Sequence, residues 1–121
     1  AIRIGNPASW ELAIAAREHS NGYFGAISDE KILEAHRILS SEVGVFVEPA
    51  SAISVAGLLE RAEAGEIPKD ATVVLTVTGH GLKDPQWALR AADGSDVTPT
   101  VVSTDIGEIA GVLGLGTAVE A

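Results

Sequence analysis

Apolar residues recur at helical spacing in several stretches of the chain, and capping or helix-breaking residues bound most of these stretches. Asparagine and proline at positions 6 and 7 suit a helix start, and Ser28, followed by two carboxylates, suits another. The stretch from Ala50 begins with small, almost uncharged residues, which is typical of a helix that packs closely on several sides. The pattern predicts helices from Asn6 to about Ser20, from Ser28 to Gly44, from Ala50 to Ala64, around Trp87 to Leu89, and from Asp105 to Leu113.

Short apolar runs rich in β-branched residues mark the predicted strands. The clearest extends from Thr72 to Thr78, where every residue is β-branched or leucine, as in a strand buried on both faces of a parallel sheet. Shorter runs lie at 23–27 and 45–47, and residues 97–102 are expected to be extended after a turn at 93–96. Alternating helices and strands predict a three-layer α/β fold, a partial parallel sheet flanked by helices.

Composition predicts one soluble domain over residues 1–121, with 46% apolar residues available for a core. Only about three strands are recognisable, against the usual five or six, so the sheet is expected to be incomplete. The chain opens on Ala1-Ile2-Arg3-Ile4-Gly5, the pattern of a strand already under way, and contains no methionine. We therefore expect a piece of a longer protein.

The net charge and the residue types present exclude several classes of function. The net charge of −9 has the wrong sign for binding nucleic-acid phosphates. There is no apolar run near the ~18 residues that a membrane span needs. The absence of cysteine removes disulfides, thiolate zinc sites and thiol nucleophiles, and is compatible with a cytoplasmic location. His19 and His36 are expected to be ordinary helix residues, because neither has partners at metal-ligand spacing.

Two predicted strand ends carry the candidate site. Thr78 ends one strand and is followed by Gly79-His80-Gly81, where glycine can adopt positive φ or let the backbone approach a ligand. Glu48 ends another, so both residues are expected on the rim where open α/β sheets bind ligands. Two alternatives stay open: the glycine turn is only a tight connection, and Glu48 only stabilises the N-terminus of the helix that follows it.

Three motifs taken together carry a family resemblance: residues 1–10 (AIRIGNPASW), 46–52 (FVEPASA) and 73–85 (VVLTVTGHGLKDP). From Ala1 to about Leu113 the chain resembles, in order, the carboxyl-terminal part of the threonine synthases. These are fold-type-II pyridoxal-phosphate (PLP) enzymes of the tryptophan-synthase-β-like group. The resemblance implies that residues 1–121 are the carboxyl-terminal part of a PLP-dependent α/β catalytic domain, within the large domain of that fold.

The resemblance also implies an activity and a cofactor site. The family converts O-phosphohomoserine and water to threonine and phosphate on PLP. Thr78 matches the residue whose hydroxyl lies at the pyridine nitrogen, Glu48 falls near the cofactor rim, and Ala1 passes one face of the ring. For Lys83 and Asp84 no role is assigned beyond bracing the turn, and His80 occupies a variable position of the motif.

The chain also departs from the family pattern. The Schiff-base lysine and the phosphate-binding loop of the family precede this region, and Lys31, Lys69 and Lys83 lie in no such motif. We therefore expect the chain alone to be inactive without the missing amino-terminal half, and the intact enzyme to be a homodimer. The alternatives are a related threonine or serine dehydratase, and a non-catalytic module whose open sheet edge pairs with another copy.

Overall fold

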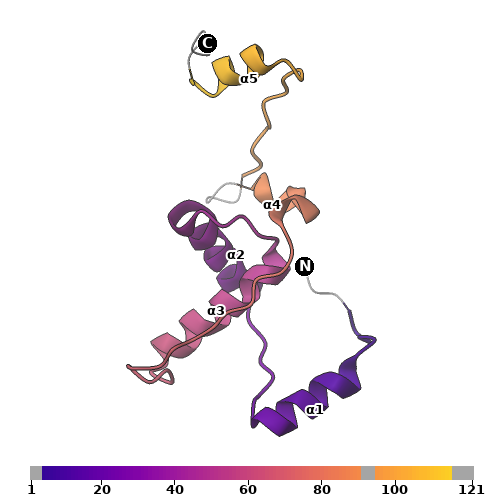
Figure 1. The fold of residues 1–121 in the computed structure, drawn as a ribbon, viewed down its shortest axis with the longest axis vertical. Helices are drawn as coiled ribbons and strands as arrows, with labels where there is room; N and C mark the ends of the chain where they lie inside the picture. The colour runs from indigo at the N-terminus through magenta and orange to yellow at the C-terminus, as the bar shows by residue number, and fades with distance from the viewer. Residues whose placement is uncertain (1–3, 91–94, 116–121) are drawn as a thin grey trace, which may run out of the picture. The chain divides into compact units, whose positions relative to one another are not determined.

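The computed structural model describes residues 4–90 and 95–115, which belong to two compact units that meet in sequence between Ala88 and Leu89. Figure 1 shows the helices in chain order. These elements are α1 (Trp10–Ser20), α2 (Asp29–Ile38), the π-helical turn η1 (Leu39–Val43), α3 (Pro49–Glu63), the 3₁₀ turn η2 (Gly81–Lys83), α4 (Pro85–Ala88) and α5 (Ile106–Val112).

Local capping signals explain most of the helix boundaries. The Ser28 side chain accepts a hydrogen bond from the Lys31 N–H at the start of α2, and Asp105 caps α5 in the same way. Asn21 adopts a left-handed conformation, with φ of 53°, and ends α1. The predicted helices are therefore confirmed, although α1 begins at Trp10, after a turn, rather than at Asn6.

Helices α2 and α3 pack side by side and form the core of the first unit (Figure 1). Ala35 of α2 and Ala52 of α3 are both 0% exposed, and such small side chains let two helix backbones approach closely. Lys31 links the helices at the surface, with 2.9 Å between its Nζ and Glu60 Oε2. The close packing predicted for the third helix is confirmed. The buried apolar residues are Ile32, Ala35, Leu39, Val47, Ala52 and Ala56.

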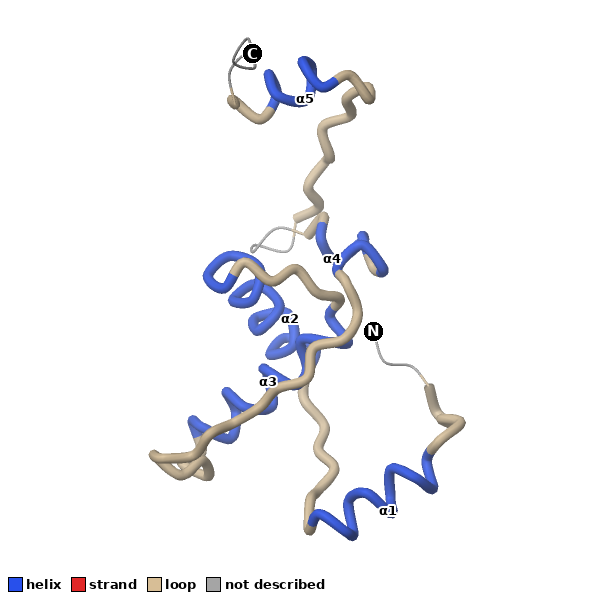
Figure 2. Tube along the Cα trace, viewed as in Figure 1, coloured by secondary structure: helices blue, strands red, loops and turns tan. Residues whose placement is uncertain are grey.

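The predicted partial parallel sheet is not formed by the described residues. They contain two isolated antiparallel bridges, Val47 with His80 and Arg90 with Asp96, and no continuous strand (Figure 2). The stretch 72–78 runs extended beside α3, but Val74 is 87% exposed rather than buried. A strand needs a neighbour to complete its backbone ladder, and within residues 4–90 and 95–115 no two predicted strands run side by side. Of the predicted turn at 93–96, residues 93 and 94 lie outside the described residues.

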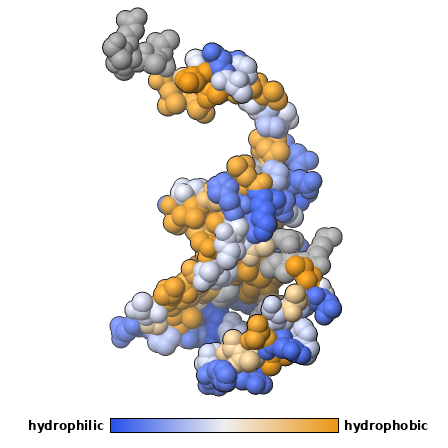
Figure 3. All heavy atoms as spheres, turned by 45° about the vertical axis from the view of Figure 1, so that its right-hand side comes forward, coloured by the Kyte–Doolittle hydropathy of each residue, from blue (hydrophilic) through white to orange (hydrophobic). Residues whose placement is uncertain are grey.

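Apolar side chains remain on the surface in both units (Figure 3). Helices α1 and α5 contain no buried residue among those described, and Trp10, Leu12, Ile106 and Leu113 are exposed. None of the helices in residues 4–90 and 95–115 combines the length and apolar character needed to cross a bilayer. The well-packed part of the first unit is therefore the α2–α3 pair together with the segments that cross it.

Candidate functional site

The candidate site lies where two segments cross at the N-terminal end of α3. The Glu48 N–H donates to the Gly79 carbonyl over 2.9 Å, and the Gly81 N–H donates to the Phe46 carbonyl over 3.2 Å. These two bonds flank the antiparallel bridge between Val47 and His80. The expected proximity of Glu48 to the end of the 72–78 segment is therefore confirmed, although an antiparallel crossing produces it rather than two parallel strands.

The glycines of the Gly-His-Gly turn make room for neighbouring side chains. Among the described glycines, positive φ occurs at Gly44, Gly65 and Gly114, and not at Gly79 or Gly81. A Cβ on Gly79 would overlap the Glu48 carboxylate, and one on Gly81 would overlap the Phe46 ring. The structure thus gives a packing reason for both glycines, and the positive φ that glycine allows is not used at either position.

Thr78 is held by its backbone and leaves its side chain exposed. Its N–H donates to the hydroxyl of Ser51, which is only 4% exposed, and the Ser54 hydroxyl donates to the Thr76 carbonyl over 3.1 Å. Among the residues that the structure describes, no hydrogen bond engages the Thr78 hydroxyl. The residue therefore combines a fixed backbone with a hydroxyl that is available to a ligand.

Glu48 is the N-cap residue of α3, yet its side chain makes no capping hydrogen bond. Its carboxylate lies 3.1 Å from Lys83 Nζ instead, with the Glu48 side chain 13% exposed and that of Lys83 70% exposed. A hydrogen-bonded cap is therefore absent, but Glu48 stands at the N-terminus of α3, where its charge can still interact favourably with the helix dipole. We call the edge of the crossing that carries Glu48, Thr78 and Lys83 the rim. At this rim the ammonium group of Lys83 balances the charge of the Glu48 carboxylate. The predicted bracing of the turn by Lys83 therefore has a structural basis.

An edge-to-face cluster of rings supports the crossing. The His80 and Phe46 ring centroids are 5.4 Å apart, and those of Phe46 and His36 are 6.1 Å apart. The Leu82 N–H donates to His80 Nδ1, which fixes this nitrogen as an acceptor. His36 is buried, as expected for a packed helix residue, whereas His19 is exposed near the end of α1. The described residues contain no group of three side chains suited to a metal ion.

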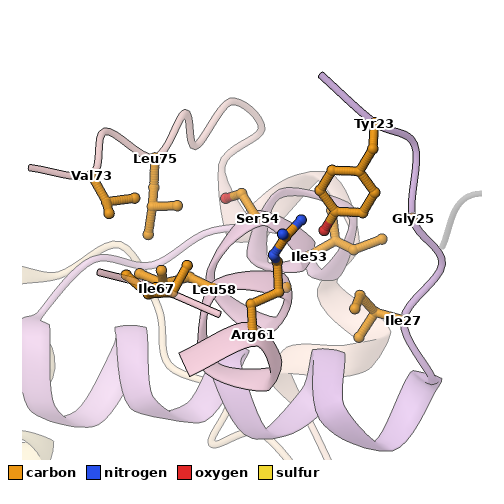
Figure 4. Close-up of a pocket in the computed structure, with 11 residues that line it drawn as sticks. Tyr23, Gly25, Ile27, Ile53, Ser54, Leu58, Arg61, Ile67, Val73 and Leu75 are labelled. Carbon is orange, nitrogen blue, oxygen red and sulfur yellow. The ribbon is translucent and has the colours of Figure 1, made fainter. Parts of the chain in front are cut away.

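Ala1, the third predicted cofactor contact, falls outside the described residues. An open cleft of about 480 Å³ lies beside α3, and Figure 4 shows the Arg61 guanidinium over the Tyr23 ring, 4.2 Å from its centroid. Among the described residues that line this cleft, Arg61 alone is charged. The cleft is largely apolar, and Thr78 and Glu48 do not line it.

The sequence interpretation missed Ser51 and Ser54. They lie three positions apart on α3, a spacing that places two side chains on one helix face. Two hydroxyls at that spacing, in the otherwise apolar first half of a helix, form the signal that could have identified them. This face of α3 meets the segment that ends at Thr78.

Comparisons with known proteins agree with these motifs. A family model described as "Pyridoxal-phosphate dependent enzyme" matches residues 1–79. The chain is 50% identical over 105 residues to a threonine synthase of Halalkalibacterium halodurans, covering 87% of this chain and 29% of the relative. For a threonine synthase of Synechocystis the identity is 58% over 90 residues, covering 74% of this chain and 23% of the relative. For a threonine synthase of Methanocaldococcus jannaschii the identity is 50% over 93 residues, covering 77% of this chain and 23% of the relative.

The chain thus spans between 23% and 29% of the length of these three relatives. The resemblance to threonine synthase that the three motifs indicate is confirmed. The family model covers more than half of the chain, and it includes both Glu48 and Thr78. The chain therefore belongs to the family of pyridoxal-phosphate dependent enzymes.

Proposed function

We propose that residues 1–121 are the carboxyl-terminal part of a PLP-dependent α/β catalytic domain, and that the whole protein is a threonine synthase. Its reaction would convert O-phosphohomoserine and water to threonine and phosphate. The observation that carries the proposal concerns Thr78: its backbone N–H is bonded to a buried serine, whereas its exposed hydroxyl has no hydrogen-bond partner among the described residues. Support for the reaction comes from relatives named threonine synthase at 50–58% identity.

The donor set at the rim fits this cofactor. When bound, PLP supplies the electron sink of the reaction. A neutral hydroxyl such as that of Thr78 can hydrogen-bond to the pyridine nitrogen without holding it protonated, as a carboxylate would. The carboxylate of Glu48 at the same rim is paired with Lys83, so its negative charge is balanced. We therefore assign the nitrogen contact to Thr78 and a role in shaping the rim to Glu48.

The remaining parts of the proposal concern the whole protein. The Schiff-base lysine and the phosphate-binding loop are assigned to the rest of the polypeptide, and a cytoplasmic homodimer is the state that the resemblance implies. O-phosphohomoserine is the proposed substrate. A dehydratase is the alternative, and assays of the whole protein on O-phosphohomoserine and on threonine distinguish the two reactions.

The proposal predicts that Thr78→Val in the PLP-loaded whole protein shifts the visible absorption band of the cofactor. Valine has nearly the shape of threonine but cannot form the hydrogen bond, so kcat should fall roughly three- to tenfold, the worth of one neutral hydrogen bond. Thr78→Ser keeps a hydroxyl and is the matched control, with a band close to wild type. An unchanged band and kcat in Thr78→Val would contradict the assignment.

A further inference from the structure

We propose that Ser51 is a positioning residue that sets the direction of the Thr78 side chain. The inference rests on the proposed function, in which the Thr78 hydroxyl contacts the cofactor. It adds a residue of α3 that touches neither cofactor nor substrate, but acts through the backbone of Thr78. Two observations carry it, namely the anchoring of the chain on either side of Thr78 and the burial of Ser51.

The backbone around Thr78 is anchored on both sides. On one side the Thr78 N–H donates to Ser51 Oγ. On the other side the Gly79 carbonyl accepts from the Glu48 N–H over 2.9 Å. Both anchors lie at the start of α3, since Glu48 is its N-cap residue and Ser51 lies in its first turn. The orientation of Thr78 is therefore tied to the N-terminal end of a helix that contributes to the core.

Ser51 is itself held in place. Its side chain is almost fully buried, and its N–H donates to the Glu48 carbonyl over 2.9 Å as part of the first helical turn. A short side chain with one χ angle has few alternative rotamers, so a buried Ser51 offers its oxygen in a fixed direction. Ser54 differs, because it donates to the Thr76 carbonyl, two residues before Thr78, and is only partly buried.

A purely structural role for the Ser51 hydroxyl would have a different signature. Alanine at position 51 fits the same space and is the better helix former, so Ser51→Ala should retain the fold. Thr78 is exposed, so the hydrogen bond that Ser51→Ala removes is only partly buried. The expected loss is therefore in the orientation of Thr78 and not in the stability of the protein.

The test uses the PLP-loaded whole protein with Ser51→Ala, the matched control Ser54→Ala, Thr78→Val, and the double variant Ser51→Ala/Thr78→Val. The readouts are the visible absorption band of the cofactor, kcat and KM. We expect Ser51→Ala to shift the band in the direction of Thr78→Val and to lower kcat roughly three- to tenfold at nearly constant KM, as displaced catalytic groups do. Ser54→Ala removes a hydrogen bond to Thr76 and none to Thr78, so it should shift the band less than Ser51→Ala does.

The double variant decides whether Ser51 acts through Thr78. In the Thr78→Val background, Ser51→Ala should add no further shift and no further loss of kcat, because residues that share one interaction are not additive. If Ser51→Ala fails to fold, Ser51→Cys is measured instead, since it keeps a side-chain acceptor at the same position, although a weaker and larger one. It should give a smaller shift in the same direction.

The outcomes separate this inference from the proposed function. A Thr78→Val band shift with no effect of Ser51→Ala would overturn the role of Ser51 alone. Independent, multiplicative losses in the double variant would overturn it as well, and so would a Ser54→Ala effect equal to that of Ser51→Ala. A Thr78→Val variant identical to wild type would overturn the proposed function and this inference together.

Discussion

At the scale of single residues, Gly81 shows how closely the two crossing segments approach each other. Its N–H donates to the Phe46 carbonyl, and the place of its missing Cβ is taken by the Phe46 ring. The same ring packs edge-to-face with both His80 and His36. A side chain at position 81 must therefore displace a ring that joins the rim to α2.

We expect Gly81→Ala to destabilise the protein by about 1–3 kcal/mol, the usual cost of forcing an extra carbon into a filled space. The measurement is the urea dependence of unfolding. Gly57→Ala is the matched control, because a Cβ there meets Ile27 Cδ1 at an ordinary 3.9 Å and replaces glycine inside α3. That variant should be more stable by roughly 0.5–1 kcal/mol. Equal midpoints for the two variants would refute the packing explanation.

At this scale, the residues that sequence predicts best are those whose partners are near in the chain. The caps at Ser28 and Asp105 bond to N–H groups three residues away, so a local rule finds them. Glu48 follows the same local pattern, yet its carboxylate pairs with Lys83, 35 residues further on. No local rule contains that distant lysine, so the sequence located the residue and missed its interaction.

At the scale of elements, the α2–α3 pair depends on small side chains. Ala35, Ala52 and Ala56 are at most 2% exposed and lie in the core cluster with Ile32 and Leu39. The ion pair between Lys31 and Glu60 joins the two helices at their surface, where such pairs contribute little. Apolar packing in this cluster, at which the alanines let the helices approach closely, thus contributes more to the α2–α3 contact than the ion pair does.

Ala52→Leu should therefore destabilise the protein by about 1–3 kcal/mol, since a buried alanine leaves no room for three more carbons. Thermal unfolding followed by circular dichroism measures the effect. The same substitution at Ala62, which is exposed on α3, should stay within about 0.5 kcal/mol of wild type. If both variants melt together, α3 does not pack against α2 through Ala52.

Helices and strands were not equally predictable. A helix forms its backbone hydrogen bonds within itself, so periodicity and caps locate α2, α3 and α5 from sequence alone. A strand forms its backbone hydrogen bonds only with a neighbouring strand. The β-branched residues at 72–78 favour an extended backbone but do not indicate which segment would be that neighbour. In the described residues this segment instead bonds to Ser51 and Ser54 of α3.

At the scale of the whole molecule, the lysines of this chain already have other interactions or lie away from the rim. Hydrogen bonding to Glu60 raises the pKa of Lys31 and keeps its amine protonated, whereas a Schiff base needs a neutral amine. Lys83 is paired with Glu48. Lys69 is exposed in the turn that follows α3. The structure thus gives none of them the surroundings of a lysine that binds PLP covalently.

The last prediction follows from these three lysines. Borohydride reduction of the PLP-loaded whole protein fixes the cofactor on its lysine, and peptide mapping by mass spectrometry should find the label outside Lys31, Lys69 and Lys83. The pure 121-residue chain should correspondingly release no phosphate from O-phosphohomoserine, because it contributes a rim around Thr78 and no covalent anchor. The whole protein, assayed in parallel, is the positive control. A label on any of these lysines would place the covalent anchor in this region, and phosphate release by the chain alone would show that the region is a complete catalytic site.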